Sequence, residues 1–157
     1  MAEVKTGALI VIEQDIRLDE YVRTGINVDA ILTSQLLINI FEHNTPLHDG
    51  AVIVRGDRIV AATCYLPLSD NMELSKQLGT RHRAGVGISE VTDSVTIIVS
   101  EETGQVSVAQ NGKLMRNIGS SQLREVLERA QNKKIVDNSK LRQLLKGRGK
   151  HEEKHRK

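Results

Sequence analysis

The fold of this chain is decided by its residues 51–65, which read AVIVRGDRIVAATCY. Two apolar runs, Ala51–Val54 and Arg58–Tyr65, stand on either side of Gly56 and Asp57. A Gly-Asp pair suits a tight turn with a positive φ angle, and apolar runs that flank such a pair are typical of paired strands. The stretch therefore predicts a β-hairpin.

Further elements on both sides extend this hairpin into a layered domain. Residues 7–12, GALIVI, form a short continuous apolar run that predicts a strand buried on both faces. Residues 95–100 and 106–109 predict a second hairpin, followed by a turn at Asn111-Gly112. Helices are expected over residues 18–24, 29–43 and 72–78, from Ser120 or Ser121 to about Gln131, and for one turn after Asp137. Strands interleaved with helices predict an α/β fold with a mixed sheet.

Length and composition indicate one soluble globular domain. The chain has 157 residues, of which 39% are hydrophobic and 27% charged, which is ordinary for a folded domain with its own core. No apolar run approaches the roughly 18 residues that a membrane span needs, and the N-terminus lacks a signal-peptide pattern. Cys64 is the only cysteine, so an intrachain disulfide is excluded and a small buried apolar role is expected.

Aromatic content and charge argue against nucleic acid as a partner. Tyr21, Phe41 and Tyr65 are the only aromatic residues other than histidine, too few for a base-stacking platform. The formal net charge is +2, but residues 146–157 hold six Lys or Arg against two Glu, so residues 1–145 carry −2. A slightly acidic body lacks the basic face that phosphate neutralisation along DNA requires.

Three polar clusters can carry chemistry. The first is His48-Asp49-Gly50-Ala51, directly before a predicted strand, where an imidazole and a carboxylate can share a divalent metal. The second is Gly79-Thr80-Arg81-His82-Arg83-Ala84, whose guanidiniums and free helix-start amides suit a polyphosphate. The third is Ser100-Glu101-Glu102-Thr103-Gly104 after a predicted strand, with two carboxylates that can add a metal ligand.

Each cluster also has an ordinary structural interpretation. An Asp-Gly pair before a strand is usually a turn, and a lone histidine such as His48 is usually structural. Short Arg-rich stretches are common on surfaces, and a Glu-Glu pair in a turn is usually only solvated. From the residues alone, the chain therefore has metal-binding and anion-binding candidates, but no assigned reaction.

The motifs Asp49-Gly50-Ala51 and Arg81-His82-Arg83 resemble the two signature motifs of the diadenylate cyclase (DAC) domain family. The resemblance extends through residues 7–13, 45–48, 78–80 and 99–104, and covers roughly residues 7–118. Within the family, the chain is most similar to the membrane-anchored CdaA type, whose cyclase domain follows N-terminal transmembrane helices. One position departs from the typical pattern: Gly85 stands where a second alanine is common. We expect this glycine to be tolerated, with lower helix propensity.

The resemblance implies a fold, a reaction and roles for the site residues. The fold is a mixed sheet of about seven strands flanked by helices, and the reaction is the condensation of two ATP molecules into cyclic di-AMP at a face-to-face homodimer, with release of two pyrophosphates. Asp49 is implied as the ligand of a divalent metal that activates the 3′-hydroxyl, with His48 as co-ligand and Mn²⁺ preferred over Mg²⁺ or Co²⁺. Arg81, His82 and Arg83 are implied as catalytic residues together with Asp49. The implied residues that bind the nucleotide and its phosphates are Gly50, Ala51, Tyr65, Leu66, Thr80, Arg81, His82, Arg83, Ser100, Glu101 and Glu102.

Domain limits, location and partners follow from the same resemblance. Residues 7–138 are expected to form the cyclase domain, after a remnant at residues 1–6 and before a charged tail at residues 139–157. The domain is expected to be cytoplasmic, with the full-length protein anchored in the bacterial cell membrane through a segment missing here. A YbbR-domain regulator and phosphoglucosamine mutase are implied as partners.

Two other classes of function stay open. A non-catalytic nucleotide sensor could use the same pocket, although Asp49 disfavours it, because a carboxylate near phosphates is of little use without a metal. A structural oligomerisation module would leave Thr80–Arg83 unexplained.

Overall fold

The computed structural model describes residues 1–74, 78–132 and 139. The chain divides into two compact units, Met1–Gly119 and Ser120–Lys157. In the second unit, residues 120–132 are helical, which confirms the predicted helix. The helical turn expected after Asp137 lies outside the described residues, apart from residue 139.

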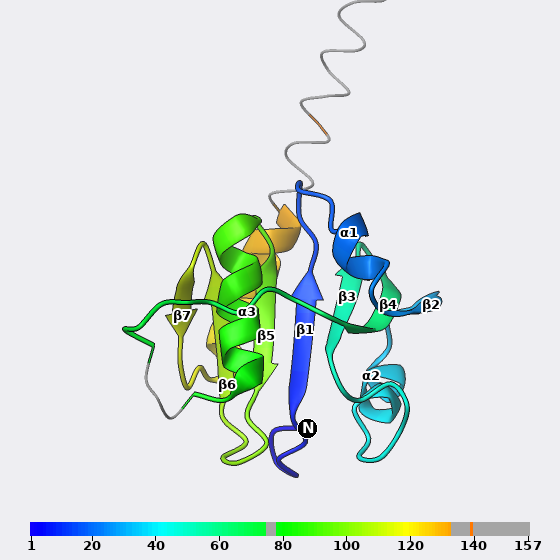
Figure 1. Ribbon diagram of the computed structural model, residues 1–157, viewed down its shortest axis with the longest axis horizontal. Helices are drawn as coiled ribbons and strands as arrows, with labels where there is room; N and C mark the ends of the chain where they lie inside the picture. The colour runs from blue at the N-terminus through cyan, green and yellow to red at the C-terminus, as the bar shows by residue number, and fades with distance from the viewer. Residues whose placement is uncertain (75–77, 133–138, 140–157) are drawn as a thin grey trace, which may run out of the picture. The chain divides into compact units, whose positions relative to one another are not determined.

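The first unit is built on a single mixed sheet. Its strands are β1 (Ala8–Ile12), β2 (Ile26–Ile31), β3 (Ala51–Arg55), β4 (Arg58–Cys64), β5 (Val95–Val99), β6 (Val106–Gln110) and β7 (Lys113–Met115). They lie in the order β2-β4-β3-β1-β5-β6-β7 (Figure 1). Only β1 and β3 pair in parallel, with Val11 opposite Ile53, while the other neighbours are antiparallel. The predicted fold class is confirmed.

Alternating side chains of the central strands form a core on each face of this sheet. Leu9 and Val11 of β1 pack with residues of α3 (Thr80–Val91) and with the residues around α1 (Asp19–Val22). Ala8 packs on the other face with Ile40 and Phe41 from the end of α2 (Ser34–Ile40). Because both faces of β1 and β3 are covered, these strands are continuously apolar, as the sequence indicates.

Both predicted hairpins are present. β3 and β4 are joined at Gly56 and Asp57, where Gly56 has φ +62°. β5 and β6 pair from Thr96 opposite Ala109 to Val99 opposite Val106. The short strand β7, which the sequence analysis did not predict, follows the Asn111-Gly112 turn. Cys64 is 2% exposed, which agrees with its expected role as a buried apolar residue.

The helix predicted over residues 29–43 is too long. Residues up to Ile31 belong to β2, which pairs antiparallel with β4, and the helix begins only at Ser34. The Thr33 hydroxyl caps it by accepting a hydrogen bond from the Leu36 N–H at 3.1 Å, and this fixes the helix start. Asp29, with φ +44°, cannot continue a right-handed helix.

Two other predicted helices are reduced. The one expected over residues 18–24 is the single turn α1. In the expected helix at residues 72–78, residues 72–74 form a turn and bend, and residues 75–77 lie outside the described residues. Within the described part of the chain, no helix is long and apolar enough to cross a membrane.

Candidate functional site

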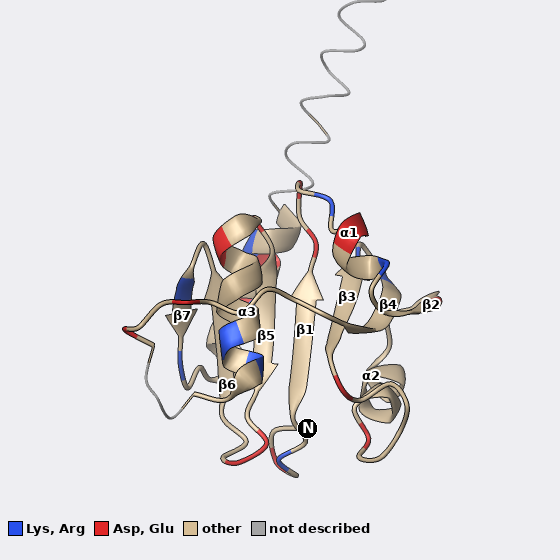
Figure 2. Cartoon of the chain, in the orientation of Figure 1, with Lys and Arg blue, Asp and Glu red and all other residues tan. Residues whose placement is uncertain are grey.

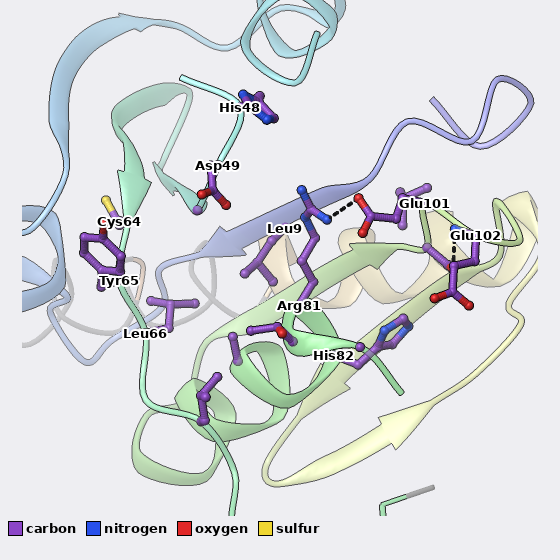
Figure 3. A pocket seen from close by; sticks show the side chains of 17 residues that line it. Leu9, His48, Asp49, Cys64, Tyr65, Leu66, Arg81, His82, Glu101 and Glu102 are labelled. Atoms are coloured by element: carbon purple, nitrogen blue, oxygen red, sulfur yellow. Dashed lines mark hydrogen bonds and ion pairs between the residues drawn. The ribbon is translucent and has the colours of Figure 1, made fainter. Parts of the chain in front are cut away.

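A cavity of about 640 Å³ opens at the end of the sheet where β3 begins and β4 and β5 end. This volume is in the range of small-molecule sites. Figure 3 shows Cys64, Tyr65 and Leu66 on one side and Arg81, His82, Glu101 and Glu102 on the other, with Leu9 between them. Figure 2 shows basic residues on the first turns of α3 and acidic residues on the loop after β5, at the same end of the sheet. The cavity therefore has an apolar half and a polar half.

Asp49 reaches the cavity because Gly50 lets two backbones approach closely. Gly50 has φ +119°, and a Cβ at this position would lie 2.7 Å from the Thr63 Cα on β4. Any residue with a side chain would be both strained and blocked there. The glycine thus sets the carboxylate at the start of β3, where it is exposed on the cavity wall.

His48 is held in one tautomer. Its Nδ1 lies 2.6 Å from the carbonyl oxygen of Thr45, and a carbonyl can only accept, so Nδ1 carries the proton. In a neutral ring with this hydrogen bond, Nε2 is the nitrogen with the free lone pair. Metal-binding histidines commonly show this arrangement, with one ring nitrogen donating to a backbone carbonyl.

These two residues form a partial metal site. The Nε2 of His48 and the carboxylate of Asp49 are suitable ligands for Mn²⁺ and similar ions. No cluster of three or more metal-binding side chains occurs among the residues that the structure describes. An ion held here would therefore have to complete its coordination with water or with oxygen atoms of a bound ligand.

The start of α3 presents hydrogen-bond donors to the cavity. Its N-cap, Gly79, makes no side-chain cap, while Gly79, Thr80 and Arg81 line the cavity. His82 N–H and Arg83 N–H both donate to the Gly79 carbonyl at 3.1 and 3.3 Å. The N–H groups of Thr80 and Arg81 come before the first N–H groups that donate within the helix. N–H groups at this place in a helix suit an anion.

His82 is a neutral imidazole at the polar end. Burial, together with the charge of Arg116, lowers the pKa of His82 below its usual value, and the carboxylate of Glu102 partly opposes this. A neutral ring has one donor and one acceptor nitrogen. At neutral pH, His82 can therefore orient an oxygen ligand by hydrogen bonding rather than by charge.

The turn after β5 adds a hydroxyl donor and two carboxylates. Ser100 Oγ accepts from the N–H groups of Glu102 and Thr103 at 3.3 and 3.2 Å. These bonds use the oxygen lone pairs and leave the hydroxyl hydrogen to donate. Glu101 accepts a hydrogen bond from Arg81, Nη1 to Oε2, at 2.7 Å.

The opposite half of the cavity is apolar. Leu9, Cys64, Leu66, Leu68 and Ala84 contribute to its wall. Burial raises the pKa of the Cys64 thiol to about 11, so this wall stays uncharged at neutral pH. Tyr65 is 76% exposed and stands at the rim, where its ring can cover a ligand that enters.

Most, but not all, of the predicted site residues meet in this cavity. Its lining includes His48, Asp49, Gly50, Tyr65, Leu66, Thr80, Arg81, His82, Ser100, Glu101 and Glu102. Ala51 is fully buried behind the wall. Arg83 lies outside the lining, with Nη1 3.5 Å from the Ser69 carbonyl, and its phosphate role stays a prediction. Leu9, Leu68 and Val99 also line the cavity but were not predicted, because apolar residues in strands and loops carry no chemical signature.

Comparison with known proteins indicates the family of this chain. A family model described as "DisA bacterial checkpoint controller nucleotide-binding" (DAC) matches residues 1–114. The chain is 56% identical to "Cyclic di-AMP synthase CdaA" of Bacillus subtilis over 94% of its own length and 54% of that protein. It is 57% identical to "Diadenylate cyclase" of Listeria monocytogenes over 81% of its length and 46% of that protein.

Solved structures with the same fold include a double mutant of DacA from Staphylococcus aureus. That structure has a TM-score of 0.82 and 53% sequence identity, and the match covers 83% of this chain and 87% of the other. The chain spans about half the length of the two full-length relatives named above. The family model, which matches well over half of this sequence, nevertheless settles its membership: the chain belongs to the diadenylate cyclase (DAC) domain family.

Proposed function

We propose that this domain is a diadenylate cyclase, which condenses two ATP molecules into cyclic di-AMP and releases two pyrophosphates. The observation that carries the proposal is the division of one cavity into an apolar half and a polar half that contains Asp49, Arg81 and His82. Adenine suits the first half and a triphosphate suits the second. The names of the Bacillus subtilis and Listeria monocytogenes relatives support the same activity.

Each condensation is a nucleotidyl transfer. The 3′-oxygen of one nucleotide forms a bond to the α-phosphorus of the other. The bond between that phosphorus and the oxygen that bridges the α- and β-phosphates breaks, and pyrophosphate leaves. The attacking hydroxyl releases one proton. Such reactions ask the protein mainly for positioning and charge stabilisation. Arg81, the Thr80 amide and the Ser100 hydroxyl are the donors that would hold the phosphates.

We also propose a divalent metal at His48 and Asp49. Support comes from the fixed tautomer of His48 and from the exposed carboxylate beside it. When bound, the ion would lower the pKa of the attacking hydroxyl and offset phosphate charge. We propose Mn²⁺ as the ion, with Mg²⁺ and Co²⁺ as alternatives, because oxygen and imidazole ligands can bind all three.

A homodimer completes the proposal. The cavity presents one set of phosphate donors, at Thr80, Arg81 and Ser100, whereas cyclic di-AMP contains two equivalent phosphodiester bonds. Two copies related by a two-fold axis, each with one ATP, would form both bonds with the same set of residues. Residues 7–138 would form this catalytic domain, as the sequence analysis predicts.

We further infer membrane attachment of the whole protein through sequence outside this chain. A solved structure from Bacillus cereus, described as a "hypothetical membrane spanning protein", is 46% identical with a TM-score of 0.73 over 75% of this chain and 58% of the other. The YbbR-domain regulator and phosphoglucosamine mutase stay predictions.

The direct test is to incubate the chain with ATP and Mn²⁺ and to identify products by mass spectrometry. Cyclic di-AMP and pyrophosphate in a ratio of one to two are expected. The initial rate per chain should fall when the protein is diluted below its dimer dissociation constant. ATP that binds but is recovered unchanged would indicate a nucleotide sensor, and absence of ATP binding would contradict any nucleotide function.

A further inference from the structure

The connection that follows β4 is fastened to α3 at a place outside the cavity. Residues 66–71, here called the strap, run across α3 (Figure 1). The Ser69 N–H donates a hydrogen bond to the Arg83 carbonyl at 3.0 Å, and Ser69 is only 2% exposed. The strap is therefore seated on the helix and is not a free loop.

A side-chain pair locks this seat. Ser69 Oγ donates to Glu90 Oε1 at 2.6 Å and accepts from the Asn71 N–H at 3.2 Å. Short hydrogen bonds to a carboxylate are the stronger kind. Neither Ser69 nor Glu90 lines the cavity. We call the Ser69–Glu90 pair the latch.

The backbones of strap and helix also touch directly. A Cβ at Gly87 of α3 would lie 2.0 Å from the Pro67 carbonyl oxygen and 2.8 Å from the Ser69 nitrogen. No real side chain can occupy those positions without moving the strap. This contact is independent of the latch and indicates the same seat.

The seat matters because the strap carries part of the cavity wall. Leu66 and Leu68 line the apolar half, and Leu68 is 53% exposed, so packing alone does not fix it. At the other end, the Tyr65 N–H donates to Thr24 Oγ1 at 2.9 Å. The Leu66–Leu68 wall thus lies between an anchor at Thr24 and the latch.

We propose that Ser69 and Glu90 are positioning residues for nucleotide binding: the latch holds the Leu66–Leu68 wall against the base without touching the ligand. This inference rests on the proposed function, which assigns adenine to the apolar half. Thr80, Arg81 and Ser100, the proposed phosphate donors, form no hydrogen bond with Ser69 or Glu90 in the described part of the chain. Arg83 Nη1 lies 3.5 Å from the Ser69 carbonyl, but Arg83 is outside the cavity lining. Loss of the latch should therefore affect the base end alone.

The test compares two probes by isothermal titration calorimetry with Mn²⁺ present. α,β-Methylene-ATP does not react at the α-phosphorus and occupies both halves of the cavity, whereas inorganic tripolyphosphate reaches only the polar half. Ser69→Ala should raise the dissociation constant of the ATP analogue about fivefold, the equivalent of one net hydrogen bond. It should leave tripolyphosphate binding unchanged. In turnover assays, KM for ATP should rise while kcat stays the same.

Variants at Glu90 separate the hydrogen bond from general damage. Glu90→Ala should reproduce the effect of Ser69→Ala. Glu90→Gln keeps an oxygen that can accept from the Ser69 hydroxyl, so affinity for the ATP analogue should stay within about twofold of the wild type.

Ser89→Ala is the matched control. Ser89 lies on α3 beside Glu90 and is 1% exposed. Its Oγ donates a hydrogen bond to the Val86 carbonyl at 2.8 Å and accepts one from the Gly112 N–H at 3.2 Å. It therefore holds the turn between β6 and β7 and not the strap. Its loss should lower thermal stability about as much as Ser69→Ala does, but change the affinity for neither probe.

The possible results separate the two proposals. Suppose that the wild type binds the ATP analogue. The positioning role is overturned if Ser69→Ala binds both probes as tightly as the wild type does, or if its affinity for both probes falls by the same factor. If the wild type fails to bind the analogue, the proposed function fails, and the role of the latch falls with it.

Discussion

Arg81 Nη1 donates a hydrogen bond to Glu101 Oε2 at 2.7 Å, which joins the first turn of α3 to the turn after β5 across the polar half of the cavity. The Arg81 side chain is 23% exposed and that of Glu101 is 54% exposed. In the free protein, the guanidinium is thus oriented and partly neutralised by a carboxylate. A phosphate that binds Arg81 must share it with Glu101 or displace that residue.

The first prediction concerns this pair. Glu101→Gln should tighten binding of tripolyphosphate in the presence of EDTA by a few-fold, because it removes a negative charge beside the anion but keeps an acceptor for Arg81. Arg81→Ala should weaken the same binding by roughly 10-fold or more, since a hydrogen bond to a charged group contributes about 1.5–3 kcal/mol. Calorimetric titration measures both. Weaker binding by Glu101→Gln would contradict this and would show that the Glu101 carboxylate aids anion binding by orienting Arg81.

The second prediction concerns the proposed metal ligand. Asp49→Asn should abolish formation of cyclic di-AMP and weaken Mn²⁺ binding, because the amide keeps the shape but loses the charge. Asp49 is exposed, so the melting temperature should hardly change. Mn²⁺ binding followed by electron paramagnetic resonance, together with product analysis, checks the role. Undiminished product with undiminished metal binding would exclude it.

Asp57→Asn provides the control for that experiment. Asp57 is also an exposed carboxylate directly beside a glycine at a strand end, but it lies in the β3–β4 turn, outside the cavity lining. Its substitution should leave the metal affinity and the rate of product formation unchanged.

How much of the fold could be predicted depended on the range of the interactions involved. The two hairpins were predictable because Gly56-Asp57 and the apolar runs beside it act locally. The strand β2 was missed because it depends on contacts that are distant in sequence: Ile26 pairs with Ala62, and Ile31 pairs with Arg58 of β4. The spacing of nearby apolar residues, which favoured a helix, gives no information about such pairing. The Thr33 cap was a local signal that could have placed the helix start correctly.

The candidate site was predictable where its residues have distinctive chemistry. Asp49, Arg81 and Ser100 are far apart in the sequence, yet all three line one cavity. The motifs could not reveal that Arg81 pairs with Glu101, or that Arg83 points toward the strap. Successive residues of a helix point in different directions, so two arginines in one motif need not share a ligand.

The third prediction is a dependence of stability on pH through Glu13. This residue is 2% exposed and accepts hydrogen bonds from Arg55 at 2.7 and 2.8 Å and from the Leu18 N–H at 3.0 Å. Burial alone would raise the pKa of Glu13, but these bonds and the charge of Arg55 outweigh it and lower the pKa below the usual 4.5. The folded protein then holds the proton less tightly than the unfolded chain. This contribution to stability is therefore complete above pH 4.5 and is lost as the pH falls through the folded-state pKa.

The corresponding experiment is urea unfolding between pH 3 and pH 7. Glu13→Gln should lower the free energy of unfolding at pH 7 by about 1.5–3 kcal/mol, because Arg55 loses its buried charged partner and keeps only the more exposed Asp19. It should also flatten the fall in stability below pH 4.5. The opposite result, a variant as acid-sensitive as the wild type, would mean that other carboxylates cause the acid response.

The last prediction concerns Gly85, the second residue after the Arg81-His82-Arg83 motif. A Cβ at this position of α3 would lie 2.9 Å from Ile98 Cδ1, 3.0 Å from Ile98 Cγ1 and 3.2 Å from Thr96 Cγ2. Ile98 and Thr96 are both fully buried in β5, so neither can move into solvent. Gly85→Ala gains up to about 1 kcal/mol in helix propensity, but overpacking of a filled core costs about 1–3 kcal/mol. We therefore expect a net loss of stability on the order of 1 kcal/mol. Ile98→Val removes the Cδ1 atom that the new methyl group meets, so the double variant Gly85→Ala/Ile98→Val should be more stable than the two single effects added together predict. A double-mutant cycle of urea unfolding measures this coupling, and strictly additive effects would show that α3 and β5 do not compete for this space.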